Sequence, residues 1–304
     1  MILVFGSLNA DLVFELQALP RPGETVLCPG YALEPGGKGA NQAAAAAKAG
    51  ARVRMVGRLG EDSFGAFLRG GLARAGVDCT GLAIAKEATG IAVIAVERGG
   101  ENQILVGSGA NLATSAHQVF DADLVPGVTL LCQNEVDPAA TSALLQRAAR
   151  RGARTMLNLA PAAALPAAVL DAVDVLVVNE IEAAMAAGDR SGDLAALARG
   201  LAVRHDLTCV VTLGREGAIA QTAAEGWRIG ALAIEPVDTT GAGDAFVGVL
   251  AAALDRGLEL PAALRRASVA AGLACTRLGA QTSQPLAADI QARLADLAPA
   301  TPLV

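Results

Sequence analysis

Aromatic residues and histidine are scarce in this chain of 304 residues. Aromatics make up 3% of the residues although 53% are apolar, so alanine, valine, leucine and glycine must fill the core. The two histidines, His117 and His205, lie far apart, and no G-x-S-x-G sequence accompanies them. A Ser–His–Asp hydrolase is therefore not indicated. Proton transfer is more readily assigned to a carboxylate.

Disulfide and zinc frameworks are also missing. The five cysteines are odd in number, widely scattered and free of any C-x-x-C pair. This spacing fits reduced, mostly buried thiols better than a set of bridges or a zinc site. The cysteines are Cys28, Cys79, Cys132, Cys209 and Cys275.

Positive charge and long apolar runs are lacking as well. Lys and Arg number 24 against 30 Asp and Glu, a net charge of -6, which argues against a nucleic-acid or anionic-membrane partner. The longest apolar stretches, 245–254 and 267–276, fall well short of the ~20 residues that span a bilayer. Asn9 and Asp11 follow the first apolar residues too closely for a signal peptide. We expect a soluble, cytoplasmic protein.

Short apolar runs alternate with alanine-rich helical patterns along the chain. Runs that are apolar on both faces belong in a buried parallel sheet, and the repeated strand–helix order predicts an α/β fold with helices on both faces of that sheet. The expected strands are 2–5, 53–56, 128–131, 155–157, 175–178 and 209–213. The expected helices are 41–49, 63–75, 138–151, 194–205, 244–255, 262–277 and 288–297.

Two inserted segments interrupt this rhythm. Residues 12–19 form an extended stretch, and residues 90–96 and 103–106 are typical of a hairpin around a turn at 97–102. We expect one domain, 1–304, carrying a small β-sheet lid made by segments 12–35 and 88–107. A lid with an apolar face needs a partner, so we expect a homodimer that forms through the lid.

The run Asp238-Thr239-Thr240-Gly241-Ala242-Gly243-Asp244 leads directly into an apolar helix pattern. Its glycines allow backbone N–H groups to converge at a helix start, which makes an anion hole suited to a phosphoryl group. Asp244 would lie at the mouth of that hole. The alternative is a plain helix cap, Asp244 after a glycine turn. A dinucleotide fingerprint is excluded because Phe246 occupies the last position of the motif.

A second glycine-rich run, Gly36-Gly37-Lys38-Gly39-Ala40-Asn41-Gln42, also enters a helix. It is not a Walker A loop, because Gly39 stands where Ser or Thr is required. Close backbone approach and the Asn41 amide suit a polyhydroxylated ligand; a simple turn is the competing interpretation. Asn9 and Asp11 follow the first strand, where open α/β sheets bind ligands.

Two further fragments follow buried strands. Asn179 and Glu182 come after the strand at 175–178, where a carboxylate could hold hydrated magnesium through water. The run 212–217 contains Thr212, Gly214 and Gly217 and offers a turn for a nucleotide. Each fragment alone is weak evidence, since strand ends are usually polar.

The runs at 36–41 and 238–244 together resemble the two signatures of the ribokinase-like (PfkB) sugar kinases, and the resemblance covers essentially the whole chain. It implies that family's three-layer α/β sandwich with a β-sheet lid. The runs that most resemble the members acting on ribose are Gly-Ser-Leu-Asn-Ala-Asp at 6–11, 36–42, Gly-Ala-Asn at 109–111, Asn-Leu-Ala-Pro at 158–161 and Arg-Leu-Gly-Ala-Gln at 277–281.

The resemblance implies ATP-dependent phosphorylation of a primary sugar hydroxyl, D-ribose above all, with Mg²⁺ and K⁺. Asp244 matches the catalytic base, and Gly241, Ala242 and Gly243 match the anion hole. The sugar-binding positions are matched by Asn9, Asp11, Gly37, Lys38, Asn41, Glu135 and Asp244. Nucleotide contacts are matched by Asn179, Thr212, Gly214, Gly217, Gly243 and Ser268. Glu182 matches the magnesium carboxylate, and the potassium site is matched by Asp238, Thr240, Ala274, Arg277, Gly279 and Ser283.

Three positions depart from the family pattern. Asn134 stands where an apolar residue is common, Ser268 stands where His or Asn is expected, and the run Gln281-Thr282-Ser283 lacks the usual Pro. These changes leave substrate and nucleotide preference open. A fructokinase, a 2-keto-3-deoxygluconate kinase and a nucleoside kinase remain alternatives, as does a non-catalytic sugar or nucleotide sensor. The intact Asp244 argues against the sensor.

Overall fold

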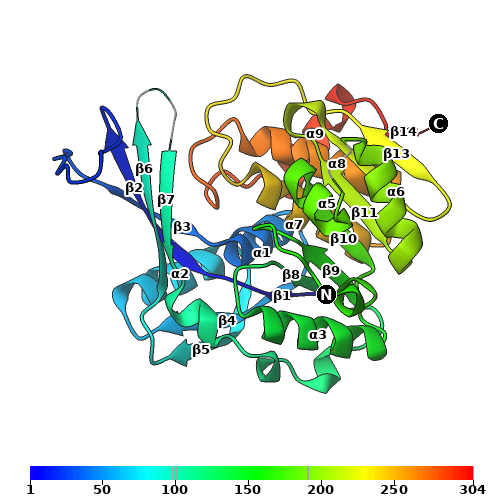
Figure 1. Ribbon diagram of the computed structural model, residues 1–304, viewed down its shortest axis with the longest axis horizontal. Helices are drawn as coiled ribbons and strands as arrows, with labels where there is room; N and C mark the ends of the chain where they lie inside the picture. Colours follow the sequence, from blue (N-terminus) through cyan, green and yellow to red (C-terminus); the bar gives the residue numbers. More distant parts are fainter. Residues whose placement is uncertain (98, 100–101, 190–191, 304) are drawn as a thin grey trace.

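A computed structural model describes residues 1–97, 99, 102–189 and 192–303, and its centre is one large sheet (Figure 1). The strand order is β14-β13-β12-β11-β10-β9-β8-β1-β4-β5. The seven strands from β11 to β5 pair in parallel. Their bounds are β1 Ile2–Phe5, β4 Val53–Gly60, β5 Asp78–Ala85, β8 Thr129–Cys132, β9 Arg154–Asn158, β10 Val175–Asn179 and β11 Thr208–Thr212.

Alternate side chains of the central strands enter two separate cores. In β1, Ile2 and Val4 belong to one core, while Leu3 and Phe5 belong to the other. All four are at most 1% exposed, which explains why the run is apolar without alternation. The predicted α/β class with a mostly parallel sheet is confirmed.

Helices cover both faces of the sheet (Figure 1). One core holds the inner sides of α1 Lys38–Lys48, α2 Ser63–Arg74, α7 Ala242–Asp255, α8 Leu260–Ala274 and α9 Ala287–Arg293. The other core holds those of α3 Pro138–Arg150, α4 Ala167–Leu170, α5 Glu180–Ala187 and α6 Leu194–His205. Short 3-10 helices are η1 Gly109–Ala113, η2 Ala116–Gln118, η3 Asp121–Asp123, η4 Gly214–Glu216 and η5 Leu294–Asp296.

Some boundaries differ from those expected. Helix α1 begins at Lys38 rather than at residue 41, because the glycine run itself forms the first turn. Helix α8 ends at Ala274, so Arg277 lies in the following loop. One edge of the sheet is antiparallel, which the sequence did not reveal: β12 Ala218–Gln221, β13 Gly226–Ile229 and β14 Thr301–Pro302.

A second sheet of four strands stands apart from the main body (Figure 1). Its order is β3-β2-β6-β7, and β2 pairs with β6 in parallel. The strands are β2 Asn9–Leu16, β3 Ala32–Gly36, β6 Gly90–Glu97 and β7 Asn102–Gly107. The expected separate small sheet is confirmed, although β2 starts at Asn9 instead of residue 12. Part of the expected turn at 97–102 lies outside the described residues.

Over the described residues, no helix is both long and apolar enough to cross a membrane. All five cysteines are free, as their spacing predicted. Cys132 and Cys209 are fully buried in the sheet, and burial raises the pKa of both thiols. These two side chains therefore act as small apolar core residues.

Candidate active site

The carboxyl ends of three neighbouring strands and the start of α7 border one open cavity of about 180 Å³. Asn158, Asn179 and Thr212 are the last residues of β9, β10 and β11. Open α/β sheets bind ligands at this edge. The cavity brings together eight polar or glycine residues, seven of them from predicted site positions: Lys38, Asn158, Asn179, Glu182, Thr212, Gly241, Gly243 and Asp244.

Gly241 is the N-cap of α7 and has the left-handed φ of 75°. A Cβ at this position would lie 2.7 Å from the backbone oxygen of Ala280, so the turn requires glycine. A Cβ on Gly243 would meet nothing within 4 Å. The first turn of a helix of 14 residues therefore opens on the cavity with its positive dipole end and with Gly241 and Gly243. The predicted third position, Ala242, does not line the cavity, and its N–H donates to the Thr239 carbonyl at 3.2 Å.

Asp244 lies in that first turn and is 9% exposed. Its Oδ2 accepts a hydrogen bond from Asn41 Nδ2 at 3.0 Å, and its Oδ1 accepts one from Gln42 Nε2 at 2.8 Å. Burial raises the pKa of Asp244, and Glu135 adds to the rise, while Lys38 and the two amides oppose it. A carboxyl group with these opposing influences is suited to accept a proton.

Lys38 supplies positive charge to the site through its ammonium group. Burial alone lowers its pKa, but the charges of Asp244, Glu135 and Glu182 outweigh burial and leave the pKa raised. Lys38 is therefore charged at neutral pH. It balances part of the negative charge that Asp244 and the other carboxylates gather around the cavity.

The glycine run places the N-terminus of α1 against β1 and β2. Gly37 has φ 87°, and a Cβ there would lie 2.7 Å from the backbone nitrogen of Asn9. A Cβ on Gly39 would lie 2.6 Å from the nitrogen of Ser7. Only glycine permits this close approach, which brings Lys38 and Asn41 beside the start of β2.

Asn9 and Asp11 both lie on β2, where the small sheet joins the main body. Asn9 is 5% exposed and its Oδ1 accepts a hydrogen bond from Asn111 Nδ2 at 2.8 Å. The pKa of Asp11 is raised to about 7 by burial and by the charges of Glu135, Glu34 and Asp244. Its buried Oδ1 has no hydrogen-bond partner. An unpartnered carboxylate oxygen of this kind is a ready acceptor for a ligand hydroxyl.

Glu135 follows β8 and is held in place from two sides. Its Oε2 accepts hydrogen bonds from Ser7 Oγ at 2.6 Å and from the Lys38 backbone nitrogen at 3.0 Å. The structure thus gathers Asp11, Lys38 and Glu135, as the sequence predicted. The side chain of Asn134 donates to the carbonyl of Pro161 instead, at 2.8 Å.

Asn179 and Glu182 form a reciprocal cap at the start of α5. Asn179 Oδ1 accepts from the Glu182 nitrogen at 2.8 Å, and Glu182 Oε2 accepts from the Asn179 nitrogen at 2.7 Å. Burial raises the pKa of Glu182, while the Asn179 N–H and Lys38 lower it. The cap fixes the Glu182 carboxylate at the cavity wall. This role in the fold is compatible with a second one toward a ligand.

Three other positions that were predicted to contact the nucleotide lie outside the cavity. Gly214 and Gly217 form the turn after β11, and neither lines the cavity. Ser268 also lies away from the cavity: it is 3% exposed, and its hydroxyl donates to the Gly230 carbonyl at 2.5 Å. This hydrogen bond joins α8 to the residue that follows β13, so Ser268 has a structural role in the fold.

Asp238 joins two loops beside the start of α7. Its Oδ1 accepts from the Thr240 nitrogen at 2.8 Å and its Oδ2 from the Gly279 nitrogen at 2.9 Å, which helps to lower its pKa against the effect of burial. Lys48 on α1 donates to the carbonyls of Gln281 and Gln284, at 3.1 and 3.2 Å. The six predicted potassium positions thus lie on or beside these loops: Asp238, Thr240, Ala274, Arg277, Gly279 and Ser283.

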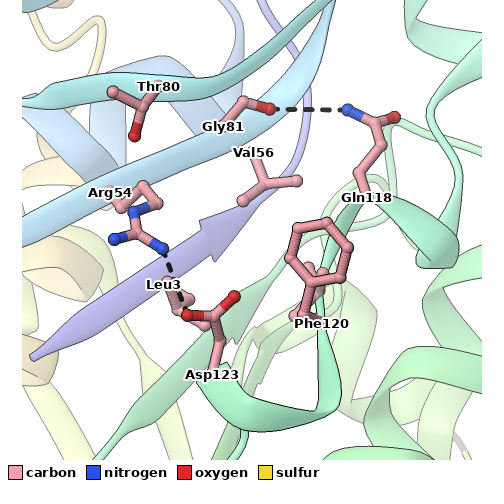
Figure 2. Close-up of a pocket in the computed structure, with 9 residues that line it drawn as sticks. Leu3, Arg54, Val56, Thr80, Gly81, Gln118, Phe120 and Asp123 are labelled. Carbon is pink, nitrogen blue, oxygen red and sulfur yellow. Dashed lines mark hydrogen bonds and ion pairs between the residues drawn. The ribbon is translucent and has the colours of Figure 1, made fainter.

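A second cavity, of about 230 Å³, lies beside β1, β4 and β5 and contains none of the predicted site residues (Figure 2). Arg54 lines this cavity, and its guanidinium forms ion pairs with Asp78 at 2.9 Å and with Asp123 at 3.2 Å. Gln118 donates to the carbonyls of Gly57 and Gly81, at 2.9 and 3.5 Å. The polar groups of this cavity therefore already have partners within the protein.

Five residues that support the site have no role assigned to them from the sequence. Ser7, Gln42, Asn111 and Asn158 all fall within runs that resemble the kinase family, so the signal was present. Gln133 lies outside those runs, although its side chain donates to Gln42 Oε1 at 2.7 Å. What these residues bind could not be read from the runs themselves.

Comparisons with known proteins agree with this geometry. Residues 1–287 match the model of the pfkB family carbohydrate kinases. The chain is 34% identical to the ribokinase of Haemophilus influenzae over 288 residues, covering 93% of this chain and 94% of that protein. It is 32% identical to a deoxyribokinase of Salmonella typhimurium, covering 93% and 95%. The structure of Arabidopsis thaliana ribokinase complexed with ribose and ATP is similar, with TM-score 0.87, 31% identity and coverage of 96% and 98%.

The chain therefore belongs to the pfkB family of carbohydrate kinases. Its fold is that of the similar ribokinase structure. Within the family, the relatives described above are kinases of ribose and deoxyribose.

Proposed function

We propose that this protein is an ATP-dependent ribokinase, which transfers the γ-phosphoryl group of ATP to the primary hydroxyl of D-ribose. The observation that carries the proposal is the position of Asp244, a buried carboxylate in the first turn of α7, beside Gly241 and Gly243 and next to the polar cluster of Asn9 and Asp11. The similar Arabidopsis enzyme binds ribose and ATP together.

The reaction follows from the placement of these groups. Asp244 accepts the proton of the attacking sugar hydroxyl, whose oxygen displaces ADP from the γ-phosphorus in line. The N–H groups of Gly241 and Gly243 and the Lys38 ammonium stabilise charge that develops on the transferred oxygens. Asn9, Asp11, Asn41 and Glu135 would bind the sugar hydroxyls and orient the one that reacts.

The residues present fit the two cations that the family implies. Glu182 offers a fixed carboxylate, which together with phosphate oxygens suits hydrated Mg²⁺, the ion that neutralises charge on the transferred group. Over the described residues no group of three or more His, Cys, Asp or Glu side chains could hold a metal. A K⁺ site would thus use Asp238 and backbone carbonyls of the adjoining loops, oxygen donors that hard cations accept.

The small sheet supports the proposal of a lid that also forms a homodimer. Every residue of β7 is exposed, and three consecutive apolar side chains, Ile104, Leu105 and Val106, are 54%, 73% and 56% exposed. An apolar strand exposed in this way is stable in water when a second copy covers it. Light scattering at micromolar concentration tests the dimer; a monomer would overturn it.

The free cysteines suit the reducing cytoplasm, which we propose as the compartment of this protein.

Two observations leave the substrates of related kinases as alternatives to ribose. The deoxyribokinase is almost as similar as the ribokinases, and Ser268 and Asn134 depart from the family pattern. A coupled assay of ADP release with ribose, 2-deoxyribose, fructose, 2-keto-3-deoxygluconate and adenosine decides among them. We expect the highest kcat/KM with ribose. Release of ADP with none of the five would favour a non-catalytic sensor and overturn the proposal.

A further inference from the structure

Gln42 lies at the centre of a buried amide network that ends on Asp244. It is 0% exposed, as is Gln133, and Asn158 is 8% exposed. Gln42 Nε2 donates to Asp244 Oδ1 at 2.8 Å and to Asn158 Oδ1 at 2.9 Å, and its Oε1 accepts from Gln133 Nε2 at 2.7 Å. Both N–H groups of the Gln42 amide and its carbonyl are therefore used.

The two outer amides determine which end of the Gln42 amide faces Asp244. Gln133 Nε2 donates to the oxygen of Gln42, while Gln133 Oε1 is itself buried without a partner. Asn158 donates to the Val177 carbonyl at 3.1 Å, which leaves its own oxygen facing Gln42. A rotated Gln42 amide would place oxygen against carboxylate and nitrogen against nitrogen. The network thus presents an N–H, and only an N–H, to Oδ1 of Asp244.

Glycine makes room for the far end of the network. A Cβ on residue 6 would lie 2.0 Å from Gln133 Oε1, so the amide of Gln133 occupies the space that a side chain at Gly6 would fill. This contact places Gln133 between β1 and α1.

The two oxygens of Asp244 therefore have different surroundings. Oδ1 is bound to the internal network, whereas Oδ2 is bound to Asn41, which the proposed function places against the sugar. Asn41 Oδ1 is buried and has no partner, consistent with an amide that still awaits a ligand. Gln42 contacts the base without belonging to the set of residues proposed to bind sugar.

We propose that Gln42 is a positioning residue, which anchors Oδ1 of Asp244 so that Oδ2 receives the proton of the attacking hydroxyl. This inference rests on the proposed function. In the step, the sugar O–H bond breaks, its proton goes to Oδ2, and the oxygen forms a bond to the γ-phosphorus. The bond from phosphorus to the bridging oxygen breaks, and ADP leaves with that electron pair.

Gln42→Leu removes the anchor with little change of size. We expect kcat to fall about 10- to 100-fold, since loss of alignment at a reacting group has effects of that order, with the KM of ribose changed less than about threefold. The amide stabilises the ionised carboxylate, so its loss should also move the acid limb of the kcat–pH profile upward by about one pH unit. A merely structural role would lower thermal stability without moving that limb.

Gln42→Glu keeps the shape and places a second carboxylate beside Asp244. Two neighbouring carboxylates share a proton, so the acid limb should move upward further than in Gln42→Leu. Gln146→Leu is the matched control, because the half-buried Gln146 donates to Ser142 within α3 and lies outside the amide network, so its profile should equal that of the wild type. If Gln42→Leu does not fold, the profile of Gln42→Glu decides alone.

The outcomes separate this inference from the proposed function. If the wild type phosphorylates ribose but both Gln42 variants keep the wild-type kcat and acid limb, the positioning role is wrong and the kinase assignment stands. If the wild type phosphorylates no sugar, the proposed function fails first. Ribose binding by calorimetry in each variant shows whether the site is still formed.

Discussion

Asn111 Nδ2 donates a hydrogen bond to Asn9 Oδ1 at 2.8 Å, across 102 residues of chain. Asn111 also bonds both polar groups of the Leu8 backbone, the nitrogen at 2.9 Å and the carbonyl at 3.1 Å. This one buried side chain therefore fixes the start of β2 and the orientation of the Asn9 amide. With its oxygen engaged, Asn9 has its N–H groups left for a ligand.

Asn111→Asp tests this arrangement with an isosteric change. The carboxylate still accepts from the Leu8 nitrogen, but it can no longer donate to Asn9 Oδ1 and repels it instead. We expect the Asn9 amide to turn over, the KM of ribose to rise about tenfold or more, and the free energy of unfolding to fall by about 1–3 kcal/mol. The KM of ATP should stay the same.

Asn102→Asp is the matched control for that measurement, because Asn102 is exposed on β7. Its steady-state constants should equal those of the wild type. Equal increases in the KM of ribose and of ATP for Asn111→Asp would mean general loss of structure and would contradict the assigned role.

Asp244→Asn removes the proposed base while keeping its shape. Because burial already disfavours the charge of Asp244, the neutral amide should be accommodated with a melting temperature close to that of the wild type. We expect kcat to fall at least about 1000-fold, within the range for loss of a general base, with ribose affinity nearly unchanged. Single-turnover phosphorylation and ribose calorimetry measure the two effects; near-normal turnover would refute the assignment.

The raised pKa of Asp11 predicts pH-dependent ribose binding. With a pKa of about 7, Asp11 is largely protonated below neutral pH, whereas hydrogen bonds from sugar hydroxyls favour the carboxylate. Ribose affinity should therefore fall on acidification, by about tenfold per pH unit well below pH 7. Calorimetry without ATP between pH 5 and about 8 measures this dependence separately from catalysis. A flat profile would contradict it.

The same shift has an opposite effect on stability. Because the folded-state pKa of Asp11 lies above the ordinary aspartate value of 3.8, the folded protein binds more protons than the unfolded chain between pH 3.8 and about 7. The contribution of Asp11 thus favours the folded state most at acid pH and is lost as pH rises through that window. Asp11→Asn should flatten this part of the stability profile and weaken ribose binding at every pH.

Local patterns in the sequence were enough to predict the sheet and most of the residues that line the candidate cavity. Strands such as β1 are apolar on both faces, and the glycine runs before α1 and α7 require special backbone geometry, so both features are visible in short windows. The position of Asp244 beside the cavity follows from its motif alone. The antiparallel strands β12 and β13 were not predicted, because they are short and are defined by their hydrogen-bonded pairing rather than by an apolar pattern.

Long-range contacts could not be predicted from those windows. Gln42 stands inside a recognised motif, but its role depends on Gln133 and Asn158, which are 91 and 116 residues away along the chain. The raised pKa of Asp11 likewise arises from Glu135 and Asp244, which only folding brings near. Ser268 could be aligned with a nucleotide position, yet its hydrogen bond to Gly230 appears only in the structure.

Gly241 and Gly243 lie two residues apart in one motif, and their alanine variants should fail in different ways. Gly241 has φ 75°, and a Cβ there would contact the backbone of Ala280, so Gly241→Ala should lower the free energy of unfolding by more than about 1 kcal/mol. A Cβ on Gly243 would meet no atom within 4 Å, so Gly243→Ala should change stability by less than about 0.5 kcal/mol.

Gly243→Ala should instead lower kcat. Gly243 lines the cavity at the first turn of α7, where the proposed reaction brings the phosphoryl group to the backbone N–H groups. A methyl group in that space would keep the phosphoryl oxygens away, and loss of one such donor costs about 100- to 1000-fold in kcat. Thermal unfolding and kcat measured on both variants check the contrast. A stable, fully active Gly243→Ala would place phosphoryl transfer elsewhere than at the start of α7.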